Sequence, residues 1–204
     1  MNLRALKAAE KEFLKMYPGG FKHPEMVEIG KKHKMDKLTE FAKTSFSKSQ
    51  FDDEEEVLSN VTKLIARSTM VSMFEKPKFR DLIKTLSNKS KETLVEAYYE
   101  ILHGKEKYGF ELLVSELRKH KLAKWPLVTA VQAYHKPQKE VFIKPTTTKL
   151  IIDHLDLDLK YQPLPTWDFY KEYRKDIKLM KSKVGKSLSP NNPAFCGFLM
   201  MTLG

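Results

Sequence analysis

The sequence predicts an all-α protein of one domain, and three observations lead to this prediction. Apolar residues recur three and four positions apart in nearly every segment, which is the spacing of a helix face. Prolines and glycines fall where those segments would begin or end. No flexible linker divides the 204 residues. We therefore expect one multi-helix bundle over residues 1–204, with residues 1–50 as a peripheral helical part and at most one short β element near residues 140–143.

The first quarter of the chain predicts three helices. Residues 3–16 carry apolar side chains at helical spacing, and the Pro18-Gly19-Gly20 break ends that helix. A second helix is expected to begin at Pro24, because proline fits a first helical turn. A third is expected to cover residues 36–46.

The acidic run at residues 52–56 predicts a helix start rather than a cation site. Its carboxylates would face the unpaired N–H groups and the positive end of the helix dipole. An apolar stripe that includes Val57, Val61 and Leu64 follows at helical spacing. Residues 68–74 are apolar, and we expect them either to continue this helix or to form a buried connector.

Four helices are expected in the middle of the chain, each with an apolar stripe. Serine favours a helix start, proline fits its first turn and glycine favours its end. On these signals the helices cover residues 78–86 after Pro77, 91–102 between Ser90 and Gly104, 106–119, and 127–134 after Pro126.

The last third of the chain begins with its one extended stretch, residues 140–143. This stretch ends at Lys144, because the residue before a proline is biased away from helix. Thr146 or Thr147 is expected to cap the next helix. Two aromatic-rich helices follow, and we expect their aromatic residues in the core rather than as stacking platforms. The first of these helices covers residues 167–183, after Thr166, and the second begins at Ser189-Pro190. Their aromatic residues are Trp167, Tyr170, Phe195 and Phe198.

The net charge of the chain is +11 and rests on lysine. Of the 37 basic residues five are arginine, and 26 residues are acidic. Lysine attracts anions as a hydrated point charge, whereas arginine has the two-point geometry that reads bases. The surplus of lysine therefore indicates a surface that binds phosphate backbones rather than one that recognises a base sequence. The charge is uneven, because residues 51–104 carry ten acidic and eight basic side chains, net −2.

The single cysteine and the shortness of the apolar stretches indicate in which cellular compartment the protein is expected. Cys196 excludes an internal disulfide and fits a reducing compartment. It lies between aromatic residues without a cationic neighbour, so we expect a buried, inert thiol. The longest apolar stretch, residues 198–201, is far too short to span a bilayer, and no secretory signal is visible. We expect a cytoplasmic protein with no membrane contact.

Catalytic and cofactor signatures are missing from the sequence. It contains no glycine-rich phosphate loop, no Gly-x-Ser-x-Gly turn and no paired cysteines, so we expect no cofactor and no metal. Two acidic–histidine groupings leave a metal or acid–base site open as an alternative to solvated surface. They are Glu96 with Glu100 and His103 on one helix face, and residues 153–158.

The best candidate for a binding site is the helix start at residues 144–149. Lys144, Thr146, Thr147 and Lys149 would combine lysine charge, threonine hydroxyls and free backbone N–H groups into an anion site. The alternative is a threonine cap with incidental lysines. A second basic element, residues 76–80, places a phenylalanine on a helix stripe, so we expect that ring in the core and the charges pointing outward.

Four strings resemble those of a bacterial protein family of unknown function, and this resemblance spans nearly the whole chain. They are YPGGF at 17–21, FEKPKFRD at 74–81, KPTTTK at 144–149 and SPNNPAF at 189–195. Residues 144–203 also resemble the closing third of helix-hairpin-helix DNA glycosylases, with a Lys/Pro-Thr helix start, a tryptophan-led long helix and a final aromatic helix. The hairpin and catalytic aspartate of those enzymes have no counterpart here, so this resemblance implies fold alone.

Three functions remain open from the sequence. The leading one is a non-catalytic, nucleic-acid-associated protein that contacts phosphate backbones through lysine. The first alternative is a protein–protein interaction module or homo-oligomer, because the apolar end at residues 198–203 must dock inside the protein or onto a partner. The second alternative is an enzyme with its site at the 144–149 helix start, glycosylase-like by analogy.

Overall fold

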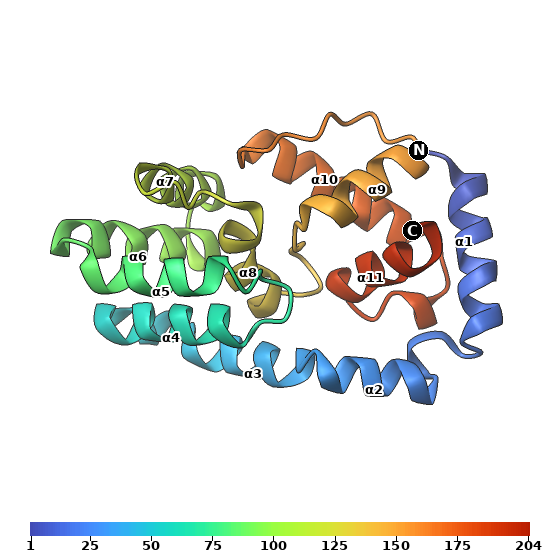
Figure 1. Ribbon diagram of the computed structural model, residues 1–204, viewed down its shortest axis with the longest axis horizontal. Coiled ribbons are helices and arrows are strands. Elements are labelled where there is room, and N and C mark those ends of the chain that lie inside the picture. Colours follow the sequence, from blue (N-terminus) through green and yellow to red (C-terminus); the bar gives the residue numbers. More distant parts are fainter.

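The computed structural model describes residues 1–204 and confirms the all-α fold (Figure 1). Eleven α-helices and three short 3₁₀ helices follow one another without a strand, so the extended residues 140–143 pair with no neighbour. In chain order the elements are α1 (Leu3–Met16), η1 (Gly20–Lys22), α2 (Pro24–Lys32), α3 (Met35–Ser45), η2 (Lys48–Asp52), α4 (Glu54–Arg67), α5 (Glu75–Thr85), α6 (Asn88–His103), α7 (Glu106–Lys119), α8 (Trp125–His135), α9 (Pro145–His154), α10 (Trp167–Lys181), η3 (Lys186–Leu188) and α11 (Asn192–Leu203).

A single hydrophobic core of 51 buried residues runs through the molecule. In one half of the molecule, the centre of this core is helix α8, in which every residue from Trp125 to Tyr134 is buried. A helix that is apolar all round must be enclosed, and α8 packs against α3, α4, α6 and α7. Residues of the first quarter also belong to this core, among them Leu6, Phe13 and Leu38.

The other half is organised by α11, which packs against α1, α9 and α10 (Figure 1). Phe198 on α11 meets Phe13 on α1 edge to face, with ring centroids 5.2 Å apart. The backbone N–H of Asn2 donates to the carbonyl oxygen of Leu155 over 2.6 Å, which ties the start of α1 to the end of α9. The first part of the apolar C-terminal helix is therefore docked inside the protein.

The aromatic residues expected in the core of the last two helices are largely found there. Tyr170, Phe195 and Phe198 are buried. Trp167 is only partly buried, and the guanidinium of Arg174 lies over its ring at 5.5 Å. The expectation is confirmed for three rings and holds in part for the fourth.

The expected starts of α6, α9 and α11 are wrong. Ser87, not Ser90, caps α6, because its hydroxyl oxygen accepts the Ser90 N–H over 3.3 Å. Asn191 caps α11 by accepting the Ala194 N–H over 2.8 Å, so the helix begins after Ser189-Pro190. Neither threonine caps α9: Lys144 holds the N-cap position without a side-chain bond, because Pro145 already starts the helix.

Candidate functional site

The connector between α8 and α9, residues 136–144, positions the predicted anion site. Asn192 on α11 donates from Nδ2 to the carbonyl oxygens of Gln138 (3.2 Å) and Glu140 (3.1 Å). Thr129 on α8 accepts the backbone N–H of Ile143 at its Oγ1 over 3.1 Å. Side chains of two helices thus satisfy the extended backbone, which explains why it needs no strand partner.

A partly buried ionic cluster, formed by Glu106, Lys139, Glu140 and Arg174, holds the same connector against α7 and α10. Arg174 pairs with both carboxylates. Lys139 Nζ lies 3.1 Å from Glu140 Oε1 and 3.2 Å from Glu106 Oε2. The hydroxyl of Tyr170 donates to Glu140 Oε2 over 2.8 Å. Two cations face two carboxylates, so the cluster is balanced in charge.

The electrostatics of this ionic cluster point to structure rather than catalysis. Burial acts to raise the pKa of Glu106, but hydrogen bonds and charge from Arg174 and Lys139 outweigh it and hold that pKa below its ordinary value. Burial and the nearby Glu140 carboxylate raise the pKa of Tyr170 well above its ordinary value. Neither group is poised to exchange a proton at neutral pH.

Sequence reasoning missed the ionic cluster, although one signal was present. Arg174 stands four positions after Tyr170, on the apolar side of the helix that became α10. A lone arginine within an apolar stripe indicates a buried partner. The partner itself could not be read from the sequence, because Glu106 lies 68 positions away.

The start of α9 brings three of the four predicted anion-site residues to the surface. Lys144, Thr146 and Lys149 are exposed, and neither lysine forms an ion pair with a carboxylate. The backbone N–H groups of Thr146 and Thr147 donate to no protein acceptor, and the first turn of α9 carries no acidic residue.

Thr147 departs from the predicted arrangement. Its side chain is 8% exposed and belongs to the buried side of α9, together with Thr148, Ile151 and Ile152. Its backbone N–H still faces the helix end, but its hydroxyl does not join the lysines at the surface. The reason is periodicity, because residues 147, 148 and 151 share one face of a helix.

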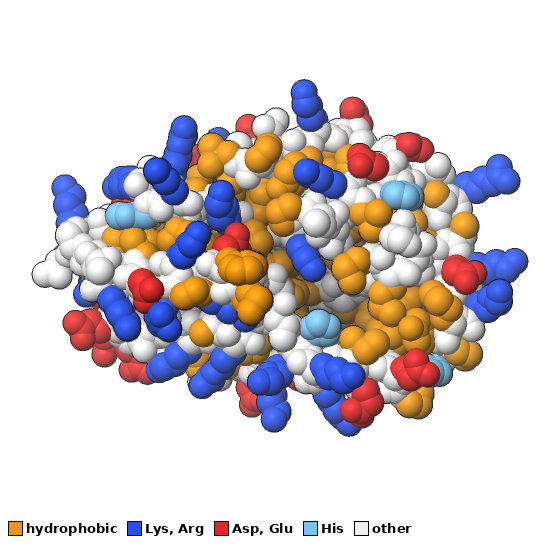
Figure 2. All heavy atoms as spheres, in the orientation of Figure 1, with side chains coloured by type: hydrophobic (Ala, Val, Ile, Leu, Met, Phe, Trp, Pro, Cys, Tyr) orange, Lys and Arg blue, Asp and Glu red, His pale blue; other side chains and the backbone are white.

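The connection from α4 into α5, residues 68–74, corrects another expectation. It neither continues α4 nor lies buried throughout. Val71 is buried, whereas Met73 and Phe74 are 74% and 75% exposed. Figure 2 shows a small hydrophobic patch, bordered by both basic and acidic side chains, in the middle of the viewed face, where Figure 1 shows this connection.

Polar side chains hold this connection in place. The Ser68 hydroxyl bonds the buried hydroxyl of Tyr134 on α8 over 2.9 Å. Thr69 Oγ1 lies 2.7 Å from Nδ1 of His33 at the end of α2. The Ser72 hydroxyl oxygen accepts the Phe74 N–H over 3.2 Å. The two exposed apolar side chains therefore project from an anchored loop.

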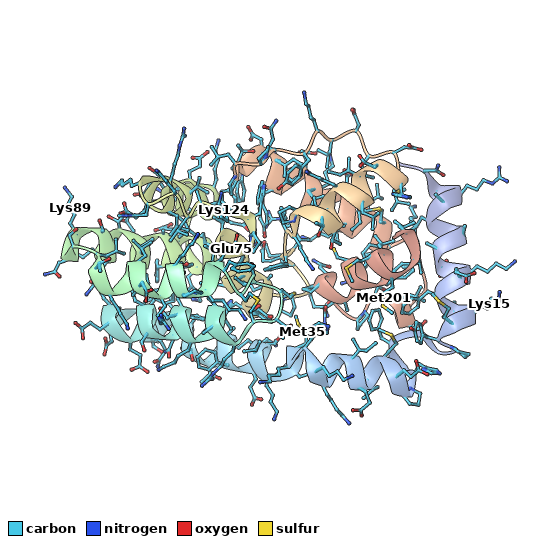
Figure 3. All side chains as sticks on the ribbon, viewed as in Figure 1. Lys15, Met35, Glu75, Lys89, Lys124 and Met201 are labelled. Carbon is cyan, nitrogen blue, oxygen red and sulfur yellow. The ribbon has the colours of Figure 1, made fainter.

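Basic residues lie around this loop. On α5, Phe79 is buried while Lys78 is exposed, as expected. Figure 3 shows Lys124, at the start of α8, beside Glu75. Burial raises the pKa of Glu75, and the charges of Lys124 and Lys78 partly offset this effect. One oxygen of that carboxylate, Oε2, is buried without a partner, and the residue as a whole is half-buried.

The turn between α7 and α8 displays further basic side chains. Lys121 has a φ of 59°, the left-handed region where a helix end usually carries glycine. The Leu122 N–H donates to the Leu117 carbonyl oxygen over 2.9 Å, as in a Schellman turn. A side chain at this backbone position costs about 1 kcal/mol. The turn thus presents an exposed lysine where glycine would be less strained.

An open cleft of about 870 Å³ between η2, the start of α4 and α6 has the opposite charge. Four carboxylates and one lysine line it, together with two aromatic rings, so it would repel phosphate. The residues are Asp52, Glu54, Glu92, Glu96, Lys48, Phe51 and Tyr99. This cleft accounts for the negative charge expected over residues 51–104.

The two acidic–histidine groupings do not form metal sites. No three His, Cys, Asp or Glu side chains are arranged to hold a metal ion. In the second grouping, Asp156 accepts the Asn2 side-chain amide over 3.0 Å. The side chains of Glu96, Glu100 and His103 have other partners, namely the Tyr108 hydroxyl (2.8 Å), the Lys105 backbone N–H and the Phe46 carbonyl oxygen (2.8 Å).

The single cysteine of the chain, Cys196, is buried. Burial raises the pKa of its thiol to about 12, as befits an inert thiol.

None of the helices combines the length and apolarity that crossing a membrane requires. Comparison with protein-family models, with curated proteins and with solved structures finds no match.

Proposed function

We propose that this protein associates with nucleic acid through the phosphate backbone and without catalysis. The observation that carries the proposal is a surplus of unpaired lysine. Eight of the 37 lysine and arginine side chains lie within 4.0 Å of a carboxylate, which leaves most of the positive charge free for a polyanion. The eight are Lys7, Lys31, Arg80, Lys107, Lys119, Lys139, Arg174 and Lys175.

The distribution of the charge favours non-specific binding. Figure 2 shows lysine and arginine side chains spread over much of the viewed face rather than gathered in one band. Interactions of this kind with phosphate supply affinity and carry no sequence information. A cytoplasmic location is part of the proposal, since nucleic acid is present there and a single unpaired cysteine fits a reducing compartment.

The start of α9 is the most specific element of the proposed surface. Lys144 precedes the free N–H groups of Thr146 and Thr147 at the positive end of the helix dipole, and Lys149, whose ammonium lies 5.0 Å from the centroid of the Tyr161 ring, follows in the next turn. A phosphate would be favoured there over a neutral ligand. The ionic cluster of Glu106, Lys139, Glu140 and Arg174 supports this geometry by fixing the preceding connector.

A charge-reversal experiment tests the proposal. We expect Lys144→Glu combined with Lys149→Glu to weaken binding to a fluorescein-labelled DNA duplex, measured by anisotropy between about 50 and 200 mM salt. The slope of log affinity against log salt should flatten by about one unit for each phosphate that the variant no longer neutralises. Both lysines are exposed, so the melting temperature should change little.

Lys11→Glu combined with Lys15→Glu on α1 is the matched control. These lysines are also exposed and unpaired, and the change in net charge is the same. A larger decrease in affinity for the α9 variant supports a local site, whereas equal decreases support a diffuse surface. Wild-type protein that fails to bind duplex or single strand at about 50 mM salt would contradict the proposal itself.

Self-association is a second candidate function. Figure 2 shows hydrophobic side chains gathered over the corner where α11 meets α1 and α2, and Met201, labelled in Figure 3, lies there. Met200, also on α11, is exposed. Patches of this kind commonly mark interaction surfaces. A molecular mass by sedimentation that rises with protein concentration, and falls back after Met200→Lys with Met201→Lys, would support it.

A further inference from the structure

We infer that the loop carrying Met73 and Phe74 is a docking site for the unstacked bases of single-stranded nucleic acid. This inference rests on the proposed function and narrows its substrate to single strands. The occupant is a polyanion with exposed aromatic faces, bound by stacking of a base on the Phe74 ring and by lysine along its backbone.

The exposure of these two side chains requires an explanation. Adjacent Met and Phe side chains at 74% and 75% exposure leave apolar area in water that burial would stabilise. They are the two most exposed large hydrophobic residues of the chain. Val71, two positions earlier, is buried, so the loop itself packs against the protein while its tip does not.

The tip is also held in place before any ligand arrives. The Ser68 hydroxyl forms a hydrogen bond with the Tyr134 hydroxyl, and the Thr69 hydroxyl forms one with the His33 ring. The Ser72 hydroxyl oxygen accepts the backbone N–H of Phe74. Phe74 itself is the residue that precedes α5, in a helical backbone conformation. Because the backbone that carries the ring is already held, the loop loses little conformational freedom when the ring contacts a base, which favours affinity.

The charge around the tip matches a nucleic-acid strand. Lys76, Arg80 and Lys84 follow at intervals of four along α5 and thus share one side of the helix. Of these, Arg80 pairs with its neighbour Asp81, and the two lysines pair with no carboxylate. Lys78 and Lys124 lie near Glu75, and their charges partly offset that of its carboxylate. Five basic side chains, those of Lys76, Lys78, Arg80, Lys84 and Lys124, stand against the two carboxylates of Glu75 and Asp81, so the net charge around the tip is positive.

A single strand suits this surface better than a duplex. In a duplex the bases are stacked on one another, and phosphates alone meet a convex protein surface. In a single strand every base has a free face that an aromatic ring can cover, with little dependence on sequence. The basic residues around the tip that pair with no carboxylate include Lys76, Lys84 and Lys124, and a lysine contacts phosphate without reading bases.

The test compares three substitutions at Phe74 on two probes, fluorescein-labelled oligothymidine and a duplex of equal length. Phe74→Ala should weaken oligothymidine binding by about 5- to 150-fold, the range for removing one stacked base. Its salt slope should not change, because phenylalanine is uncharged. Phe74→Leu should behave like Phe74→Ala, and Phe74→Trp should bind like wild type with its tryptophan fluorescence quenched by the oligonucleotide. Duplex binding should be the same in all four proteins.

Because Phe74 is largely exposed, each variant should have the melting temperature of the wild type, so a change in affinity would not result from unfolding. Leu164→Ala, at 38% exposure on another loop, is the control and should leave both affinities unchanged.

The outcomes separate this inference from the proposed function. Wild-type protein that binds neither probe overturns both. Salt-dependent binding of both probes with Phe74→Ala equal to wild type overturns the base-docking site alone. Phe74→Leu equal to wild type also overturns it, because an apolar contact without stacking would then suffice. Binding of vesicles rich in phosphatidylserine, abolished by Phe74→Ala while oligothymidine binding persists, would assign the tip to a membrane surface instead.

Discussion

At the scale of the residue, His135 has an unusual environment. Burial lowers its pKa to about 4, and the charges of Lys136, His103 and Lys43 act in the same direction. Its Nδ1 is buried without a partner, and its ring meets that of His103 edge to face at 5.6 Å. Between about pH 4 and pH 6.5 the folded protein therefore keeps this imidazole neutral, whereas a free histidine would be protonated.

We expect this histidine to make stability depend on pH. Between about pH 6.5 and pH 4 the unfolded chain binds a proton at His135 that the folded chain does not. The free energy of unfolding should therefore fall as the pH falls through this window. Partial exposure limits the decrease to about 1–2 kcal/mol. Urea unfolding at pH 7 and pH 5 measures it, and His135→Gln should lose less stability over the same interval.

The comparison of His135→Gln with the wild type over this pH interval decides the prediction. Equal pH dependence in wild type and His135→Gln would show that His135 does not control it.

At the scale of the element, the connector of residues 136–144 depends on Arg174. We expect Arg174→Leu to reduce the free energy of unfolding by about 3–5 kcal/mol, because it leaves the buried Glu140 with Lys139 as its one remaining cation. It also removes a guanidinium that lies 5.2 Å from the Tyr170 ring. Chemical denaturation followed by circular dichroism measures the change.

The neighbouring residue supplies the control for Arg174. Lys175 forms an exposed ion pair with Glu172 at 3.2 Å, so Lys175→Leu should change stability by less than about 1 kcal/mol. Replacing Glu106 and Glu140 by glutamine in the Arg174→Leu protein should restore part of the stability, since no buried charge is then left unpaired. An unchanged midpoint for Arg174→Leu would refute the structural role of the ionic cluster.

At the scale of the whole molecule, the continuous core predicts cooperative unfolding. Its 51 residues include side chains from α1, α3, α8 and α11, so no part of the chain has a core of its own. We expect thermal unfolding followed by circular dichroism, which reports on every helix, to coincide with unfolding followed by fluorescence of Trp125 and Trp167.

Two separate transitions would contradict that prediction. If residues 1–50 formed a peripheral unit, helical signal would decrease before the tryptophan signal, because both tryptophans lie in the later part of the chain. The packing of Phe13 against Phe198 argues for one transition. Phe198→Ala should lower the midpoints of both signals together, at a cost of about 3–5 kcal/mol.

The sequence by itself determined the class of the fold and most of the helices. Apolar spacing, prolines in first turns and Gly104 as a helix end act within about four residues, so they can be read from the chain directly. The lysines of the predicted anion site also lie at a helix start, as expected. The threonine caps failed because Pro145 starts the helix earlier, and helical spacing then turns Thr147 into the core.

Only the tertiary structure decided which residues face one another and which face water. Arg174 meets Glu106 across 68 positions of sequence, and Asn192 holds the connector at Glu140 across 52. Phe74 and Phe79 stand in the same basic segment, yet one is three-quarters exposed and the other is buried. Local signals set the helices, but burial depends on how the helices dock, and that is set by the packing of residues far apart in the chain.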